Sequence, residues 1–205
     1  MDRIEKMKSI LTDRLKSLTI VGEGTHLRHN MSAIIRSAES FGVQNVHLIS
    51  EDTKKMSGAA KGGEKWVDLS IHENTDQCLG LLKEQGYSIW VADLHPNAVT
   101  PDTLPIDQPI AIIMGTELSG VSERAKELAD GFVIVPMFGM TQSLNVSVAS
   151  ACLLQRLSTR VREKHCGGDL TEVEQQEILQ RWIARDEKEK HHRQNRLKLA
   201  DQRPQ

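Results

Sequence analysis

Two polar residues of a predicted helix, Asn30 and Arg36, have side chains that suit anion chemistry, although a separation of six positions does not place them well on one helix face. Asn30 stands at a plausible helix N-cap, and Arg36 interrupts the otherwise apolar stripe of the helix that follows. A guanidinium in that position suits a carboxylate or a phosphate. The alternative is a surface arginine whose stem packs on the core, and the residues alone leave both interpretations open.

Two further segments place polar groups at the ends of predicted strands. Residues 115–120, Gly-Thr-Glu-Leu-Ser-Gly, follow an apolar run, and their glycines allow a ligand to approach the backbone closely. Residues 133–150 pass from an apolar strand through a loop with Pro and Gly to Ser143 and Asn145, whose side chains face the same way if the chain is extended there. An ordinary βα turn and a helix N-cap are the structural alternatives.

Several site classes are not indicated. The chain has no GxGxxG or GxxxxGK[ST] phosphate loop and no GxSxG nucleophile elbow around Ser143. Its eight histidines form no HxxxH or HExxH pattern, and its three cysteines form no CxxC pair. The sequence therefore predicts no metal site, and it indicates reduced thiols of a cytoplasmic protein.

Composition and charge describe a globular chain with basic ends. The 205 residues are 39% hydrophobic and 26% charged, with a net charge of −2 and no run of about 18 apolar residues, so no membrane span is expected. The net charge is +2 over 1–28, −7 over 29–155 and +3 over 156–205. Basic terminal arms suit contact with a polyanion, although a solvated charged helix is the simpler alternative.

Hydrophobic periodicity predicts strands that alternate with helices. This pattern indicates an α/β fold with a mainly parallel sheet and helices on both faces, in which ligands bind beyond the carboxyl ends of the strands. Loops 93–97, 115–120 and 136–143 follow three of the strands and are the expected site. The expected helices are 3–18, 32–41, 75–85, 122–128, 144–162 and 170–199, and the expected strands are 46–49, 87–92, 109–114 and 132–135.

Taken in order, the three polar segments resemble the three motifs of the SpoU/TrmH family of SPOUT-class RNA ribose 2′-O-methyltransferases. The resemblance spans about residues 20–155 and is most specific in the third motif, Ser143-Leu144-Asn145-Val146-Ser147. That run and the charged tail are most similar to the enzymes that methylate guanosine-18 of tRNA. The resemblance implies transfer of a methyl group from S-adenosylmethionine to a tRNA ribose, a homodimer whose active site draws on both chains, and a C-terminal trefoil knot, which general topology rules would not predict.

The resemblance also implies roles for individual residues. Arg36 matches the catalytic arginine, and the other motif polar residues are Asn30, Glu117, Ser143 and Asn145. The cofactor-binding positions are Ala92, Gly115, Val135 and Leu144. Where the family often carries a proline before the first-motif asparagine, this chain has His29, and Arg28 is a candidate phosphate contact. The basic cluster of the tail, expected to bind RNA, includes Lys188, Lys190, Arg193 and Arg196.

The expected organisation is an N-terminal helical arm over 1–18, a catalytic domain over 19–160 and a charged helical tail over 161–205. Two alternatives stay open: the same chemistry on ribosomal RNA, and a catalytically silent knotted module that binds RNA. A nucleotide-binding regulator is disfavoured because the chain lacks a Gly-rich phosphate loop.

Overall fold

The computed structural model describes residues 2–24, 28–50, 65–116 and 119–201, without the side chains of 28, 189 and 192–201. It divides the chain into two compact units, 13–169 and a second unit of residues 1–12 with 170–205. The predicted division treats the two ends as separate arms, whereas the structure places them in one unit. None of the described helices combines the length and the apolar character that a membrane span requires.

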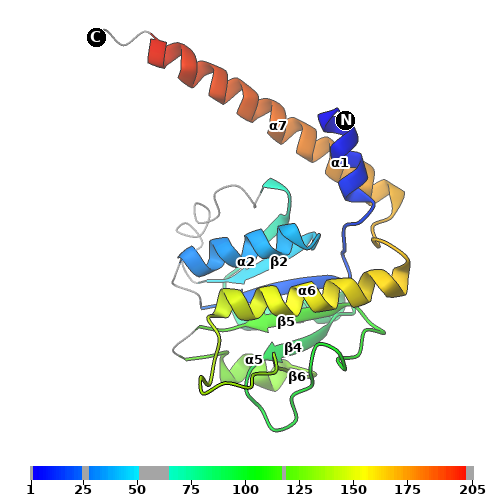
Figure 1. Cartoon of the computed structure of the whole chain (residues 1–205), viewed down its shortest axis with the longest axis vertical. Coiled ribbons are helices and arrows are strands. Elements are labelled where there is room, and N and C mark those ends of the chain that lie inside the picture. Colours follow the sequence, from blue (N-terminus) through cyan, green and yellow to red (C-terminus); the bar gives the residue numbers. More distant parts are fainter. Residues whose placement is uncertain (1, 25–27, 51–64, 117–118, 202–205) are drawn as a thin grey trace. The chain divides into compact units, whose positions relative to one another are not determined.

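The larger unit is built on a six-stranded parallel sheet in the order β3-β2-β1-β5-β4-β6 (Figure 1). The two central strands are buried along their whole length, as expected for a parallel sheet that is covered on both faces. The strands are β1 (Leu18–Glu23), β2 (Asn45–Ile49), β3 (Asp68–His72), β4 (Ser88–Ala92), β5 (Ile110–Met114) and β6 (Gly131–Val133).

Helices cover both faces of this sheet, which confirms the predicted α/β class. One apolar core lies under α2 (Arg28–Ser40) and α6 (Val146–His165), which pack against each other (Figure 1). A second core lies under α4 (Thr75–Glu84) and α5 (Glu123–Leu128). The trefoil knot stays a prediction.

The turn after α2 follows from a glycine. Gly42 adopts a φ of +76°, a left-handed conformation that costs glycine little, and it ends the helix as the sequence predicts. The carbonyl of Gly42 accepts from the Leu15 backbone N–H at 2.8 Å, so the turn also joins the segment that leads into β1.

The predictions miss two strands. The helix expected over 3–18 ends at Leu11, and the chain then enters β1 at the centre of the sheet. Strand β3 is also not predicted. For residues 54–65, rich in Lys, Gly and Ala, the sequence leaves open a loop or a short helix with loop flanks, and this segment lies almost entirely outside the described residues. Apolar residues at helical spacing, Leu15 and Leu18, continue the pattern of the first helix up to the start of β1, and this continuity hides the boundary between the two elements.

The smaller unit packs α1 (Arg3–Leu11) against α7 (Glu172–Asp201). Among its described residues, the buried apolar side chains are Met7, Leu11, Leu170, Ile178 and Trp182. Asp186 of α7 is 7% exposed and pairs with Arg3 and, at 3.0 Å, with Lys190.

Candidate functional site

A cavity of about 440 Å³ opens where the loops after β4, β5 and β6 meet. These three strands are neighbours in the sheet, and all run in the same direction, so their carboxyl ends share one edge. The structure therefore brings together the three loops that the sequence singles out. The wall includes all four predicted cofactor positions: Ala92, Gly115, Val135 and Leu144.

The loop after β5 is held in a tight turn that requires a glycine. The backbones of Thr116 and Gly120 exchange two hydrogen bonds, of 3.0 and 3.1 Å. The hydroxyl oxygens of Thr116 and Ser119 lie 2.7 Å apart, and the Thr116 hydroxyl also accepts from the Ser119 backbone N–H. A Cβ on Gly115 would lie 2.1 Å from the carbonyl carbon and oxygen of Gly120, so any larger side chain would open this turn. Glu117 lies outside the described residues.

The third motif enters α6 through an asparagine cap. The Asn145 side-chain oxygen accepts from the backbone N–H of Ser147 at 2.9 Å and from its hydroxyl at 2.6 Å. The Asn145 amide nitrogen donates to the side-chain oxygen of Asn30 on α2, at 3.3 Å. The structure thus joins two predicted site residues that are 115 positions apart. Ser143 is exposed and lines the cavity.

Arg36 lies apart from this cavity within the chain. It is exposed on α2 and is not among the residues that line the cavity. No hydrogen bond or ion pair joins its guanidinium to any residue within the described ranges.

A lysine that the sequence does not single out lies in the cavity wall, where it is paired with two carboxylates. Lys126 of α5 donates to Glu123 at 3.0 Å and pairs with Asp93 at 3.2 Å. The hydrogen bond to Glu123, followed by that to Asp93, raises the pKa of Lys126. The sequence could have indicated Asp93, because this residue begins a loop at a strand end, but no pattern in the sequence indicates Lys126.

The residues expected to bind RNA are only partly described. Lys188 and Lys190 are exposed on α7, and Lys190 pairs with Asp186 one turn earlier in the helix. The side chains of Arg28, Arg193 and Arg196 lie outside the described residues.

Comparison with known proteins gives one consistent family. The profile of the SpoU rRNA Methylase family matches residues 17–155. The tRNA (guanosine(18)-2′-O)-methyltransferase of Escherichia coli K12 is 38% identical over 86% of this chain and 80% of its own length. The protein of the same name from Thermus thermophilus is 36% identical over 74% of this chain and 79% of its own length.

A solved structure agrees with these sequence matches. The crystal structure of the Aquifex aeolicus TrmH/SpoU tRNA modifying enzyme superposes with a TM-score of 0.80 at 32% identity, over 90% of this chain and 96% of that one. The family match covers the sheet, the cavity and the three polar segments. The chain belongs to the SpoU rRNA methylase family.

Proposed function

We propose that this protein transfers a methyl group from S-adenosylmethionine to the ribose 2′-hydroxyl of guanosine-18 in the D-loop of tRNA. The cavity at three adjacent strand ends carries the proposal, because it joins the predicted cofactor positions in one wall. The relatives named for this reaction support the choice of nucleotide, since they match most of the chain.

The cavity suits the proposed cofactor in size and lining. A volume of about 440 Å³ lies within the range of about 300–1,000 Å³ for small-molecule sites. Its wall combines apolar side chains such as Val135 and Leu144 with Gly115 and Gly120 of the turn after β5. When bound, the cofactor supplies an electrophilic methyl carbon on a sulfonium.

Arg36 acts in this proposal as a clamp on the phosphate beside the target ribose. A guanidinium is always protonated in proteins, so it cannot remove the proton of the 2′-hydroxyl. Its charge instead orients the nucleotide and lowers the pKa of that hydroxyl, whose proton leaves to phosphate or water. The oxygen–carbon bond forms as the sulfur–carbon bond breaks.

The other motif residues position the site. Asn30 and Asn145 link α2 to the start of α6 through their hydrogen bond, so the helix that carries Arg36 is tied to the loop that lines the cavity. Ser143 contacts substrate or cofactor from the cavity wall. Glu117, which lies outside the described residues, holds Asn30 or a loop of a second chain in this proposal.

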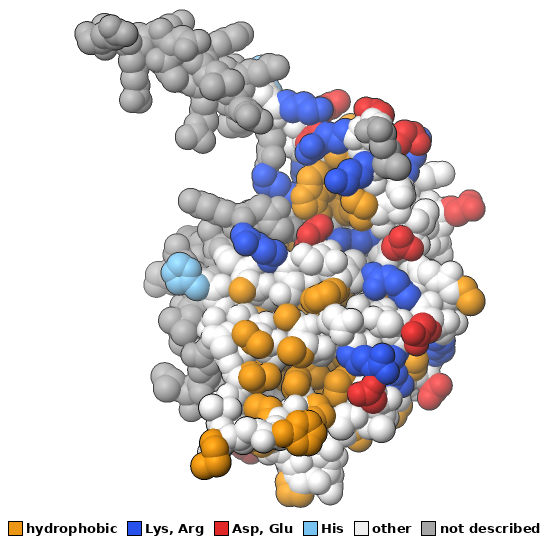
Figure 2. Space-filling model, viewed as in Figure 1, with side chains coloured by type: hydrophobic (Ala, Val, Ile, Leu, Met, Phe, Trp, Pro, Cys, Tyr) orange, Lys and Arg blue, Asp and Glu red, His pale blue; other side chains and the backbone are white. Residues whose placement is uncertain are grey.

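The site is completed by a second copy of the chain. Arg36 does not line the cavity of its own chain, so it serves the cavity of a partner in a homodimer. Figure 2 shows hydrophobic side chains gathered on the face over α6 and the loops beside it. Phe138 and Met140 in the third-motif loop are 99% and 100% exposed, and Val148 on α6 is 48% exposed, as suits an interface.

The basic ends of the chain hold the tRNA. Arg28 contacts phosphate near the active site, and the helix α7 supplies Lys188, Lys190, Arg193 and Arg196 along the RNA backbone. The three cysteines are free thiols, which suits the cytoplasm, where tRNA is modified.

The test uses radiolabelled S-adenosylmethionine with unmodified tRNA and, separately, with ribosomal RNA. We expect label in tRNA and a loss of at least 100-fold in kcat for Arg36→Ala, because one charged contact to the reacting nucleotide is worth about 3 kcal/mol. Arg124→Ala, which removes a surface arginine of α5, is the matched control and should keep wild-type activity. Label in ribosomal RNA alone would contradict the assignment of tRNA as the substrate. A near-normal rate for Arg36→Ala would contradict the proposed contact of Arg36 with the phosphate.

Mixing two inactive variants tests the shared site. Arg36→Ala and a cavity variant such as Gly115→Ala should regain part of the activity when co-expressed, because a mixed dimer contains one intact pair of cavity and arginine. A monomer in solution, or no recovery from verified mixed dimers, would contradict the two-chain site.

A further inference from the structure

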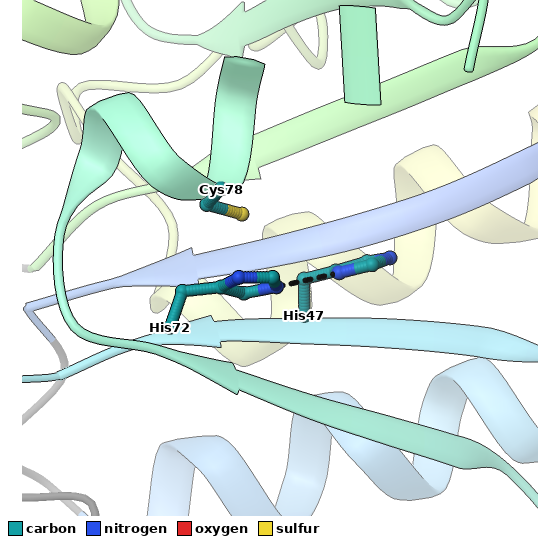
Figure 3. Close-up of side chains that lie close together, drawn as sticks. All are labelled: His47, His72 and Cys78. Atoms are coloured by element: carbon teal, nitrogen blue, oxygen red, sulfur yellow. Dashed lines mark hydrogen bonds between the residues drawn. The ribbon is translucent and has the colours of Figure 1, made fainter. Parts of the chain in front are cut away.

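A buried group of metal-binding side chains lies away from the cavity. His47 of β2 and His72 of β3 face α4, and Cys78 in the first turns of α4 points toward them (Figure 3). The three are 7%, 6% and 0% exposed. None of them lines the cavity, so the proposed methyl transfer gives them no role.

The three ligand atoms already lie close to the geometry of a metal site. All of them are within 4.8 Å of one another, and His47 Nδ1 is 3.0 Å from His72 Nε2. Tetrahedral zinc with bonds of about 2.0–2.1 Å to nitrogen and 2.3 Å to sulfur places its ligand atoms about 3.3–3.6 Å apart. The nitrogens need to separate by a few tenths of an ångström and the sulfur to move by at most about 1.2 Å, which small side-chain rotations supply.

The sheet register explains why the histidines meet. His72 pairs with Ile49, two residues beyond His47 on the neighbouring strand, so both imidazoles emerge on the same face. Val46 and Leu48 point into the opposite core, under α2 and α6. The backbone of two parallel strands thus fixes two ligands, and the helix that follows β3 supplies the third.

We propose that His47, His72 and Cys78 form a structural zinc(II) site that fastens α4 to strands β2 and β3. A site with two imidazoles and a thiolate binds zinc in preference to magnesium or calcium. The three protein ligands leave a fourth position for water, so the site has the open coordination of three-ligand zinc sites and not the closed four-ligand set of most structural ones.

One carboxylate, that of Glu23, acts electrostatically on the Cys78 thiol. Burial, followed by the charge of Glu23, raises the pKa of the Cys78 thiol to about 12. When zinc binds, the Cys78 thiol releases its proton to solvent, and the two positive charges of the ion offset the thiolate and the Glu23 carboxylate. That carboxylate is fixed by Ser122, whose backbone N–H and hydroxyl each donate to it at 2.7 Å.

The two histidines are uncharged at neutral pH. Burial, followed by the charge of His72, lowers the pKa of His47 to about 4, and burial lowers that of His72. Neutral imidazole is the form that binds zinc. In the metal-free protein only one of the two facing nitrogens can donate, so the contact is a single hydrogen bond.

The test measures zinc binding to a variant that lacks the two exposed thiols, C152S/C166S. The full-length protein is stripped with a chelator and titrated with zinc(II) alone against a colorimetric zinc chelator. We expect one zinc per chain and a rise in Tm of roughly 5–10 °C at a hundredfold excess over Kd. Adding C78S to this background should weaken binding by at least 100-fold.

Two measurements keep the proposal testable if C78S does not fold. Cobalt(II) in the C152S/C166S protein should give the intense visible bands of a tetrahedral site and a thiolate-to-cobalt charge-transfer band. In the wild-type chain, zinc should slow alkylation of Cys78 in partial denaturant at least tenfold while Cys152 reacts as before. Absence of binding, an octahedral cobalt spectrum or binding that survives C78S would overturn the site and leave the proposed methyl transfer untouched.

Discussion

Gly115 is the residue at which one added methyl group should disable the cofactor cavity. An alanine Cβ there would lie 2.1 Å from the Gly120 carbonyl, whereas ordinary contact begins at 3.4 Å, so the turn must open by about 1.3 Å. Opening it breaks the two backbone hydrogen bonds between Thr116 and Gly120. At about 0.5–1.5 kcal/mol each, their loss costs about 2 kcal/mol, which corresponds to a roughly 30-fold weaker affinity for the cofactor.

The assay is calorimetric titration of Gly115→Ala with S-adenosylhomocysteine, together with thermal unfolding. Gly80→Ala is the matched control, because a Cβ on this glycine of α4 meets nothing within 4 Å. The control should bind as the wild type does and gain about 0.5–1 kcal/mol in stability, as expected for alanine in a helix. If Gly115→Ala is folded and binds within threefold of the wild type, the assignment of this turn to the cofactor is refuted.

Three further changes test other parts of the molecule. Asn145→Ala removes the α6 cap and should lower the free energy of unfolding by about 1 kcal/mol. Asn145→Asp keeps the cap acceptor but cannot donate to Asn30, so its stability in urea should return to that of the wild type while its methyl-transfer rate stays low. Trp182→Ala should lower the stability of the smaller unit by about 3–5 kcal/mol, because this side chain is 2% exposed. Hydrogen exchange should show that α1 and α7 lose protection while the central sheet keeps it. An equal loss of protection in both units would contradict this prediction. In metal-free protein the pKa of His47 is 6.5 in the unfolded state and about 4 in the folded state, so the free energy of unfolding should be highest above about pH 6.5 and fall by up to about 3 kcal/mol toward pH 4. Urea unfolding in the presence of a chelator should show this dependence on pH, and the dependence should be weaker in His47→Gln. An unchanged dependence in that variant would contradict the prediction.

The sequence predicts the strand-end loops well because their signals are local. A continuous apolar run followed by a Gly-containing turn marks β5 and its loop, and the run before Pro136 marks β6, although that strand ends at Val133. Parallel strands place such ends along one edge, so the cavity follows from the fold class. That Asn30 contacts Asn145 is a tertiary fact, since no local pattern pairs residues 115 positions apart.

Strand β1 escapes prediction because its polar residues are satisfied by distant segments. Thr19 donates to the Asn45 carbonyl at 2.6 Å, and Glu23 is held by Ser122, 99 positions away. Gly22 leaves room for Met31, whose terminal carbon would lie 2.5 Å from a Cβ there. A Thr, a Gly and a Glu in a central strand lower its β signal, and only the folded neighbours explain them.

The His47, His72 and Cys78 group shows the same limit of local patterns. Zinc motifs are recognised by short spacings, but here the ligands are 25 and 6 positions apart and come from three elements. Strand register and the position of α4 bring them together. No motif in the chain indicates a metal, and the zinc site is an inference from the fold.

Methyl transfer to a single ribose oxygen can be tested with two tRNAs that differ only in that oxygen. One carries guanosine at position 18 and the other carries 2′-deoxyguanosine, and both are incubated with the protein and radiolabelled S-adenosylmethionine. We expect one methyl group per molecule of the first tRNA, mapped to the ribose of guanosine-18, and none in the second. Equal label in both, or none in either from a dimer that binds the cofactor, would contradict the proposed reaction.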